Sequence, residues 1–313
     1  MSRRCKIAIS EGSRTLCADL TKGFQAAVDD MKRFWEGQVE AMLPDKPDLI
    51  VIPECSDRFH HLTGETRIEY YRTRGDQMLD FWKQVAIANN TYVAYSAARE
   101  LPDGTWRNST QIIDRKGNIA GIYNKNHLVV EENTVYGMLC GKDAPIIQAD
   151  FGTIGCVICF DLNFEPLRKK YEATKPDLLL FCSMFHGGLM QNNWAYSCRS
   201  HFVGSVCGDQ CTIINPLGEL LACTTNYKHI ITHEVNLDCK VCHYDYNWER
   251  FAAMKKKYGR GVTIFDPGHV GSVLITCERD DMTVDDMLDE FEVERLDDYM
   301  VRALNHQNAH REP

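Results

Sequence analysis

Three short apolar runs in this sequence end in residues that could carry chemistry. Glu54 ends the run LIVIPE, Lys125 follows IAGIYN, and Cys159 ends IGCVIC. Reactive side chains in α/β sheets gather at the carboxyl ends of strands, so three such ends can converge. Together they supply a base, a fixed positive charge and a nucleophile, which is the minimum set for acyl transfer through a thioester.

Each of these residues has an ordinary interpretation when it is taken alone. A glutamate after a strand is usually a solvated loop residue, and a cysteine inside an apolar run is usually core. The chain holds 14 cysteines, several of them in the apolar runs GCVICF, LLLFCSMF and VGSVCGD. Because we see no export signal, we expect reduced cysteines that pack as small hydrophobes rather than a disulfide framework.

Two pairs of cysteines have the Cys-x-x-Cys spacing of zinc and dithiol sites: Cys156 with Cys159, and Cys239 with Cys242. The first pair falls in a predicted strand, where residues three apart point to opposite faces of the sheet. Two such side chains cannot easily grip one ion, so we predict no metal site.

The hydrophobic periodicity predicts the elements that must position the three strand-end residues. In the first half of the chain we expect, in order, a strand at 6–10, a helix at about 20–43, a strand at 49–54, a helix at about 69–89, a strand at 92–99 and a hairpin at 109–125. The second half repeats this order, with strands at 152–161 and 176–184, helices at 167–175 and about 191–202, and a hairpin at 211–223. The recurrence predicts one mixed α/β domain, residues 1–270, with two similar halves whose apolar strands are covered by helices.

Residues 271–313 differ in composition from the rest. The stretch ERDDMTVDDMLDEFEVERLDDYMVRALN is strongly acidic, with Met287, Phe291 and Leu296 on a possible helical stripe. We expect this acidic C-terminal tail to contact another subunit or the body of the domain.

Composition limits the partners of the protein. The chain has 313 residues, of which 44% are hydrophobic and 25% are charged, and its net charge is −9. We therefore expect no nucleic-acid partner. The N-terminal stretch MSRRCKIAISEGSRT has no apolar signal-peptide core, and no window approaches the roughly 18 apolar residues of a membrane span. We predict a cytoplasmic protein without a membrane partner.

The motifs that surround the three strand-end residues resemble those of the nitrilase superfamily of carbon–nitrogen hydrolases. The resemblance covers roughly residues 5–240 and includes PDLIVIPE, YNKNHL and GCVICFDLNFEPL in the family's order, with PDLLLFCSM and INPLGELLA in support. It implies an α/β fold, a four-layer α-β-β-α sandwich with two similar halves. It also implies a small-molecule substrate, no cofactor and a homo-oligomer.

The resemblance also assigns roles to the strand-end residues. It implies that Cys159 is the nucleophile, Glu54 the general base and Lys125 the oxyanion stabiliser, assisted by the backbone N–H of Phe160. These roles agree with thiol chemistry, because a free thiol is only slightly ionised at neutral pH and needs a base or a nearby cation.

Many members of the superfamily carry a second glutamate after the lysine, in a pattern that resembles Lys-x-His-Leu-Val-Pro-Phe-Gly-Glu. This chain reads KNHLVVEE from Lys125, one residue shorter. Aligning across the deletion favours Glu132 as the second catalytic glutamate, with Glu131 close behind as a substrate-side residue.

Residues next to Cys159 bear on the substrate. Members that hydrolyse nitriles typically have tryptophan and glutamate after the cysteine, whereas Phe160 and Asp161 follow here. D-amino-acid carbamoylases have two arginines where this chain has Leu162 and Asn163. We predict hydrolysis of a small linear amide, with an N-carbamoyl amino acid or amine as the alternative. A nitrilase or an inactive scaffold is a weaker hypothesis.

Two further residues are candidates for substrate contact. His186, in the sequence MFHGGL, follows a strand on the Cys159 side of the domain, and the glycines beside it would let a ligand approach. Arg199 could contact a substrate carboxylate, although in this family's pattern that arginine is more often structural.

Overall fold

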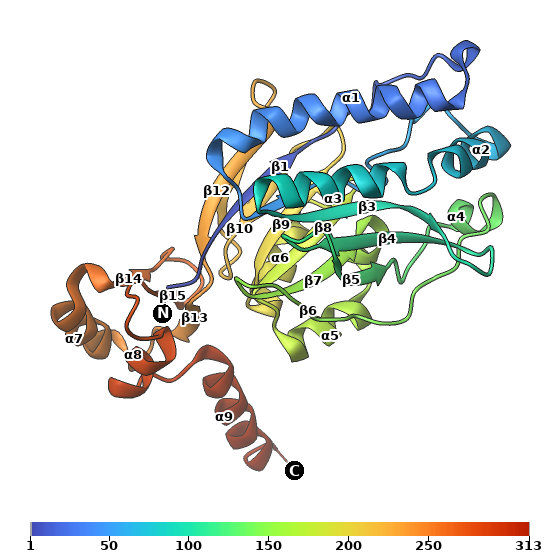
Figure 1. Cartoon of the computed structure of the whole chain (residues 1–313). Helices are drawn as coiled ribbons and strands as arrows, with labels where there is room; N and C mark the ends of the chain where they lie inside the picture. Colours follow the sequence, from blue (N-terminus) through green and yellow to red (C-terminus); the bar gives the residue numbers. More distant parts are fainter. Residues whose placement is uncertain (1, 313) are drawn as a thin grey trace. The chain divides into compact units, whose positions relative to one another are not determined.

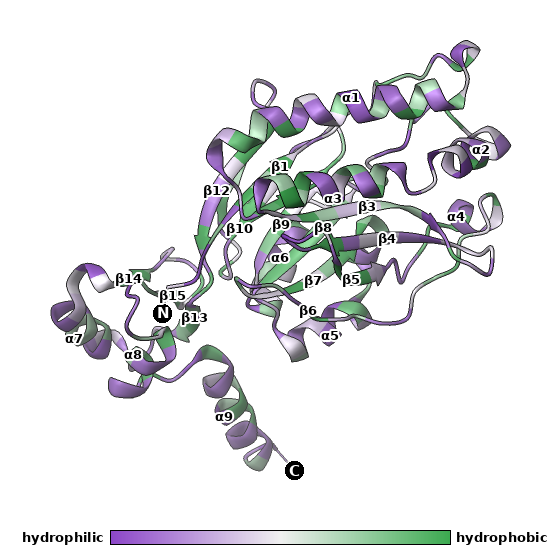
Figure 2. Ribbon diagram, viewed as in Figure 1, coloured by the Kyte–Doolittle hydropathy of each residue, from purple (hydrophilic) through white to green (hydrophobic). Residues whose placement is uncertain are grey.

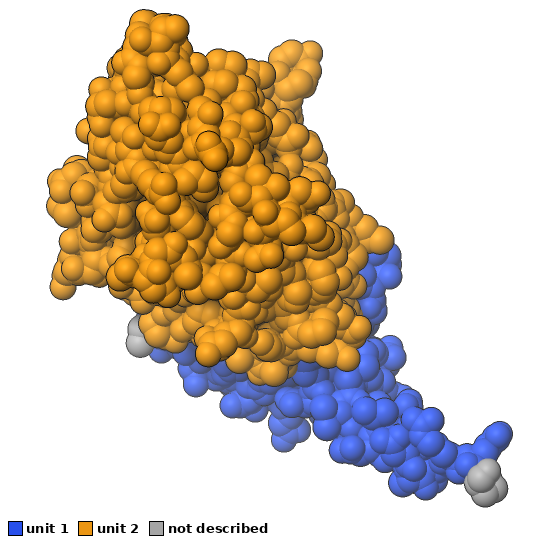
Figure 3. Space-filling model, turned by 90° about the vertical axis from the view of Figure 1, so that its right-hand side faces the viewer, with its two compact units in different colours: residues 1–4, 235–313 blue, residues 5–234 orange. Residues whose placement is uncertain are grey.

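The computed structural model describes residues 2–312, and its contacts divide the chain into two compact units. One unit is Cys5–Glu234, and the other runs from Val235 onward together with the N-terminal residues before Cys5 (Figure 3). The strand-end residues named above all lie in the first unit.

Two six-stranded sheets form the centre of the first unit (Figure 1). The first sheet has the order β12-β1-β2-β3-β4-β5 and comprises β1 (Arg4–Ser10), β2 (Leu49–Val51), β3 (Tyr92–Glu100), β4 (Trp106–Ile113), β5 (Ile119–Asn124) and β12 (Ile230–Asn236). The second has the order β11-β10-β9-β8-β7-β6 and comprises β6 (Ile147–Gln148), β7 (Thr153–Ile158), β8 (Leu178–Ser183), β9 (His201–Val206), β10 (Thr212–Ile214) and β11 (Leu220–Cys223).

The two sheets repeat one pattern of pairing. In the first, β1, β2 and β3 are parallel, and β4 and β5 continue antiparallel. In the second, β7, β8 and β9 are parallel, and β10 and β11 continue antiparallel. The expected two similar halves are therefore present.

Helices cover the outer faces of both sheets. The helices of this unit are α1 (Phe24–Met42), α2 (Gly64–Arg74), α3 (Gln77–Asn89), α4 (Val130–Thr134), α5 (Glu165–Thr174) and α6 (Leu189–Cys198). Helices α1 and α3 lie over the first sheet, α5 and α6 lie over the second, and β4 of one sheet contacts β7 of the other. This is the predicted four-layer α-β-β-α sandwich.

The helices take these positions because their sequences are amphipathic. In α1 the residues Ala27, Met31, Trp35 and Val39 are buried and recur at helical spacing. They pack with buried strand residues such as Ile50 in one apolar core. In Figure 2 the hydrophobic colour accordingly alternates with hydrophilic residues along this helix.

Several boundaries differ from the sequence-based expectation. The strand expected at 152–161 ends at Ile158, so Cys159 lies in the 3-10 helix Cys159–Asn163 and not in the strand with Cys156. The helix expected at 69–89 is two helices, because Gly75 ends α2 with a positive φ of 48°. The strand expected at 49–54 ends at Val51, just before Pro53, which has no N–H to donate. The helix expected to reach residue 202 ends at Cys198, because Arg199 adopts a left-handed conformation (φ 56°).

The second unit has its own small sheet and core. Strands β13 (Cys239–His243), β14 (Val262–Phe265) and β15 (Ser272–Cys277) form an antiparallel sheet in the order β13-β15-β14. The helices are α7 (Trp248–Tyr258), α8 (Val284–Glu290) and α9 (Leu296–Ala309). Residues before and after position 270, such as Phe251 and Met287, share one apolar core. The compact units therefore do not divide at the expected boundary of 270/271. Of the described residues, 2–312, no helix is long and apolar enough to cross a membrane.

Candidate active site

The three strand-end residues come from both sheets. Glu54 follows β2 and Lys125 follows β5, both in the first sheet, whereas Cys159 directly follows β7 in the second and begins the 3-10 helix Cys159–Asn163. The Cys159 thiol and the Glu54 carboxyl group lie near enough for the charge of Glu54 to raise the pKa of the thiol. The sandwich thus brings the ends of strands from its two sheets together at one place.

Lys125 is the centre of this group. Its Nζ lies 2.8 Å from Glu54 Oε1 and 2.7 Å from Glu132 Oε2, and its side chain is 1% exposed. Its backbone N–H donates to Asn108 O, and its carbonyl accepts from Gly141 N. A lysine with both its backbone and its ammonium fixed has little rotational freedom left to lose when a substrate binds.

Asn108, in β4, was not among the residues that the sequence singles out. Its buried Nδ2 donates to Glu54 Oε1 and to Glu132 Oε1, each at 2.7 Å. One amide group therefore holds the two carboxylates on either side of Lys125. The available signal is weak, because an asparagine inside the strand WRNSTQII also suits a position that faces solvent.

Charge balance keeps the lysine and the first glutamate ionised. Burial by itself lowers the pKa of Lys125, but the carboxylates of Glu54 and Glu132 outweigh it and raise the pKa above its ordinary value. Burial likewise tends to raise the pKa of Glu54, and the Lys125 ammonium reverses this and lowers it. Both groups are charged at neutral pH.

Cys159 is a protonated thiol at rest. Burial and the Glu54 carboxylate raise its pKa to about 12, although Lys125 and a hydrogen bond from the Met184 backbone oppose the shift. Its φ is 49°, a left-handed conformation that is strained for a residue with a side chain. Glu54 Oε2 is buried and makes no hydrogen bond to a nitrogen or oxygen of the described residues, so it is available to a proton from sulfur.

Asp161 joins the turn after β7 to the segment that carries Lys125. This fully buried carboxylate accepts hydrogen bonds from His127 N at 2.7 Å, Tyr123 Oη at 2.7 Å and Ile158 N at 3.1 Å, and it lies 2.9 Å from His127 Nδ1. Such a satisfied buried network fixes the relative position of the two segments.

The structure separates the two adjacent glutamates. Glu132 belongs to the Lys125 network and also accepts a 2.9 Å hydrogen bond from Val129 N. Glu131 is exposed to solvent. Of the two candidates, only Glu132 lies in the Lys125 network, and the exposed position of Glu131 does not support the expected substrate contact.

The loop after β8 contains His186 and Met184, and the Met184 backbone contacts Cys159. His186 Nδ1 accepts a 3.1 Å hydrogen bond from Gly188 N, and its Nε2 is buried without a partner among the described residues. Packing, and not ligand access, explains the glycine at position 187, because a Cβ on Gly187 would lie 2.3 Å from Leu162 Cδ2. In sequence, His186 lies two residues after Met184, the residue whose backbone contacts Cys159.

Phe160 and Arg199 have different positions relative to Cys159. Phe160 follows it in the 3-10 helix and leaves 36% of its surface exposed.

Arg199 precedes His201, which pairs with the N-terminal end of β8, whereas Cys159 follows the C-terminal end of β7. About five residues of strand, or roughly 16 Å, separate the strand ends next to Arg199 from the strand end next to Cys159. The guanidinium of Arg199 stacks on the ring of Tyr196, and its placement does not support the expected substrate contact.

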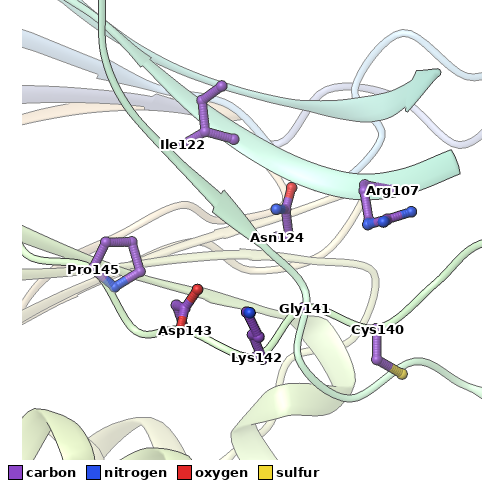
Figure 4. Close-up of a pocket in the computed structure, with 8 residues that line it drawn as sticks. All are labelled: Arg107, Ile122, Asn124, Cys140, Gly141, Lys142, Asp143 and Pro145. Carbon is purple, nitrogen blue, oxygen red and sulfur yellow. The ribbon is translucent and has the colours of Figure 1, made fainter. Parts of the chain in front are cut away.

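A separate cavity of about 350 Å³ lies beside β5 (Figure 4). It is lined by Arg107, Ile122, Asn124, Cys140, Gly141, Lys142, Asp143 and Pro145. None of these residues belongs to the charged cluster around Lys125, so we do not place the substrate there. No group of three or more metal-binding side chains occurs within residues 2–312.

The family model for carbon–nitrogen hydrolases matches residues 7–239, about three quarters of the chain. This chain belongs to the carbon–nitrogen hydrolase family. It is therefore a member of the nitrilase superfamily, as the motifs around Glu54, Lys125 and Cys159 predict, and an enzyme of the class that acts on carbon–nitrogen bonds.

Individual relatives are distant. The chain is 25% identical over 210 residues to deaminated glutathione amidase of Dictyostelium discoideum, a match that covers 62% of this chain and 71% of that protein. Saccharomyces cerevisiae Nit3, a member of branch 10 of the nitrilase superfamily, has the same fold with a TM-score of 0.58 and 17% identity, over 75% of this chain and 90% of Nit3.

An amidase from Nesterenkonia sp. AN1 also has this fold. Its TM-score is 0.58 at 15% identity, over 82% of this chain and 97% of the amidase. That structure is of a mutant with the acetamide moiety of fluoroacetamide added covalently at the active-site cysteine.

Proposed function

We propose that this carbon–nitrogen hydrolase cleaves a small linear amide through a thioester on Cys159 and releases ammonia or an amine. The observation that supports this most is the buried Lys125 ammonium between the carboxylates of Glu54 and Glu132, next to a protonated thiol. A charged cluster of this kind is expensive to bury and is typical of catalytic sites.

The first step forms the carbon–sulfur bond. Glu54 accepts the thiol proton, the sulfur attacks the amide carbon, and the π electrons of the carbonyl move to its oxygen. Lys125 Nζ and the backbone N–H of Phe160 hydrogen-bond to this oxyanion. Removing one such donor typically costs about 3–4 kcal/mol of barrier.

The second step breaks the carbon–nitrogen bond. The oxyanion collapses, the protonated Glu54 gives its proton to the leaving nitrogen, and ammonia or an amine departs from the thioester. Glu54, again a carboxylate, then takes a proton from water while the oxygen attacks the thioester carbon. Sulfur leaves, recovers a proton, and the carboxylic acid is released.

Glu132 and Asn108 act in this scheme as positioning residues. Glu132 holds the second side of the Lys125 ammonium, and Asn108 holds both carboxylates. Neither needs to exchange a proton with the substrate for the reaction to proceed.

The alternative is an N-carbamoyl substrate. The same steps would then release an amine and leave a carbamoyl thioester, whose hydrolysis yields carbon dioxide and ammonia. Carbon dioxide release therefore distinguishes the alternative from the simple amide. The name of the Dictyostelium relative, an amidase, supports the simple amide.

The test is a panel of linear amides, N-carbamoyl compounds and nitriles assayed for ammonia and carbon dioxide. Cys159→Ala is compared with the parent protein and with Cys140→Ala, which removes an exposed cysteine outside the cluster. We expect turnover of amides by the parent and by Cys140→Ala, and loss of turnover in Cys159→Ala. Full turnover by Cys159→Ala would exclude the mechanism.

A further inference from the structure

Arg58 is a charged side chain close to the reaction centre that the proposed mechanism does not use. It lies four residues after Glu54, in the loop that follows β2, and a turn hydrogen bond from its N–H to Cys55 O fixes its backbone. The side chain is largely buried, and its Nε makes no hydrogen bond within the described residues. A buried guanidinium without an anionic partner is unusual in a folded protein.

The acid next to it in sequence is committed elsewhere. Asp57 forms a buried ion pair with Arg74, with 2.7 Å between Asp57 Oδ2 and Arg74 Nη1, and the same oxygen accepts a hydrogen bond from Tyr95 Oη. The other oxygen, Asp57 Oδ1, has no partner and does not reach Arg58. Within residues 2–312, Arg58 has no carboxylate at ion-pair distance.

The surroundings of Arg58 are positively charged. Burial, together with the charges of Arg58, Arg14 and Arg67, lowers the pKa of His60 to about 4, so His60 is neutral. Its Nε2 lies 3.6 Å from Cys207 Sγ. Arg14 and Arg67 donate to backbone carbonyls, and neither forms an ion pair with a carboxylate of the described residues.

Arg14 and Arg58 are connected to the residues around the nucleophile. Arg14 donates to the carbonyls of Cys207 and Met184, and the Met184 backbone contacts Cys159. The charge of Arg58 also acts on both Glu54 and Cys207. The charge of Arg58 therefore acts on the same Glu54 carboxylate that acts on the reacting thiol.

We propose that Arg58 binds an anionic group of the substrate, so that the preferred amide carries a carboxylate at the end opposite its scissile bond. This inference rests on the proposed function and adds the class of substrate to it. A planar guanidinium with a free Nε–H can bind a carboxylate through two parallel hydrogen bonds. Arg14 and Arg67 add long-range attraction for the same charge.

A competing explanation is that Arg58 only neutralises Glu54. The two explanations differ in what a neutral substrate experiences. If Arg58 only balances charge in the protein, replacing it changes the hydrolysis of charged and neutral amides by the same factor. If Arg58 binds the substrate, its replacement lowers kcat/KM for the anionic amide only, mainly by raising KM.

The experiment uses monoamides of dicarboxylic acids, from malonamate to adipamate, each paired with the neutral amide in which a methyl ketone replaces the carboxylate. The ratio of kcat/KM for the anionic member to that for the neutral member is measured in the parent, Arg58→Gln, Arg58→Lys and Arg33→Gln. Arg33 is an exposed arginine paired with Asp30 and serves as the matched control for loss of one positive charge.

We expect a preference for the anionic member in the parent and in Arg33→Gln. Arg58→Gln should reduce the ratio about 10- to 100-fold, and Arg58→Lys should restore part of it. A parent without this preference at any chain length, or an equal loss on both substrates in Arg58→Gln, would overturn the proposal.

Binding separates failure of this inference from failure of the proposed function. The same monoamides are titrated by calorimetry into Cys159→Ala and into Cys159→Ala combined with Arg58→Gln. Tighter binding of the anionic member that Arg58→Gln abolishes supports the anion site even if no amide is turned over. Equal binding of the charged and neutral members would overturn it, whatever the hydrolysis assay shows.

Discussion

Lys125 Nζ donates a 2.8 Å hydrogen bond to Glu54 Oε1, and both side chains are buried. The pair explains how one glutamate can serve a thiol that is mostly protonated. Lys125 keeps Glu54 ionised by lowering its pKa, while the Glu54 carboxylate raises the pKa of Cys159. The base and the thiol are therefore in the protonation states that proton transfer from sulfur requires.

The two adjacent glutamates offer a matched comparison. Glu132→Gln removes a charge that holds Lys125, whereas Glu131→Gln changes an exposed side chain. Because a small displacement of a catalytic group can cost about 100-fold in rate, we expect a loss of that order in kcat for Glu132→Gln. Glu131→Gln should stay within twofold of the parent. Equal kinetics of the two variants would show that Glu132 does not position Lys125.

Asn108 can be tested through stability as well as rate. Asn108→Ala leaves two buried carboxylates without their shared donor, which should lower the free energy of unfolding by about 1–3 kcal/mol. Urea unfolding measures this loss, and Asn305→Ala, on an exposed position of α9, is the control. If Asn108→Ala unfolds at the same urea concentration as the parent, the proposed bridge contributes nothing.

The pKa of the Cys159 thiol should respond to Glu54. Burial and the Glu54 carboxylate raise this pKa to about 12, so the rate of Cys159 alkylation by iodoacetamide should still be rising at pH 9.5. Glu54→Gln removes the negative charge, so the midpoint of the pH dependence of the alkylation rate should move to lower pH, although amide turnover is lost. Peptide mass spectrometry follows the rate at this cysteine. A midpoint that does not move would contradict the electrostatic coupling.

The stability of the Glu54–Lys125 pair should depend on pH at both extremes. The folded pKa of Glu54 is below its unfolded value of about 4.3, so its contribution is present above that pH and is lost as pH falls through the folded pKa. The folded pKa of Lys125 is raised, so its contribution is present below about pH 10.4 and is lost as pH rises through the folded value.

Urea unfolding of the parent and of Glu54→Gln isolates the acid side of this prediction. The difference in unfolding free energy between them should be largest near pH 7 and should shrink at pH values below about 4.3. A difference that is constant from pH 7 to pH 3 would show that the carboxylate of Glu54 is not selectively stabilised by folding.

The reactive strand ends could be predicted because they interrupt apolar runs. Glu54 and Cys159 each follow a buried strand, and the order of helices and strands places both at the same end of the sandwich. The four layers were expected from the family resemblance, whereas the apolar runs by themselves indicated only a mixed α/β domain with two halves. The break at Gly75 was not predictable, because a glycine inside a long helical pattern is also tolerated within one helix.

Residues that act through a distant partner could not be predicted. The role of Asn108 depends on two glutamates 54 and 24 residues away in sequence. The neighbouring Asp57 is not a partner of Arg58, because it pairs with Arg74 in α2. The motif around Arg199 does not reveal which end of the parallel strands its turn occupies, so the sequence left both a substrate contact and a structural role open.

The most direct test of the central claim is the acyl group on Cys159. The parent enzyme is mixed with an excess of its best amide substrate, quenched with acid within milliseconds, and digested for peptide mass spectrometry. We predict a peptide containing Cys159 that is heavier by the acyl group, sensitive to hydroxylamine, and absent from Cys159→Ala. Steady turnover with no acyl adduct on Cys159, or an adduct on another cysteine, would contradict the thioester mechanism.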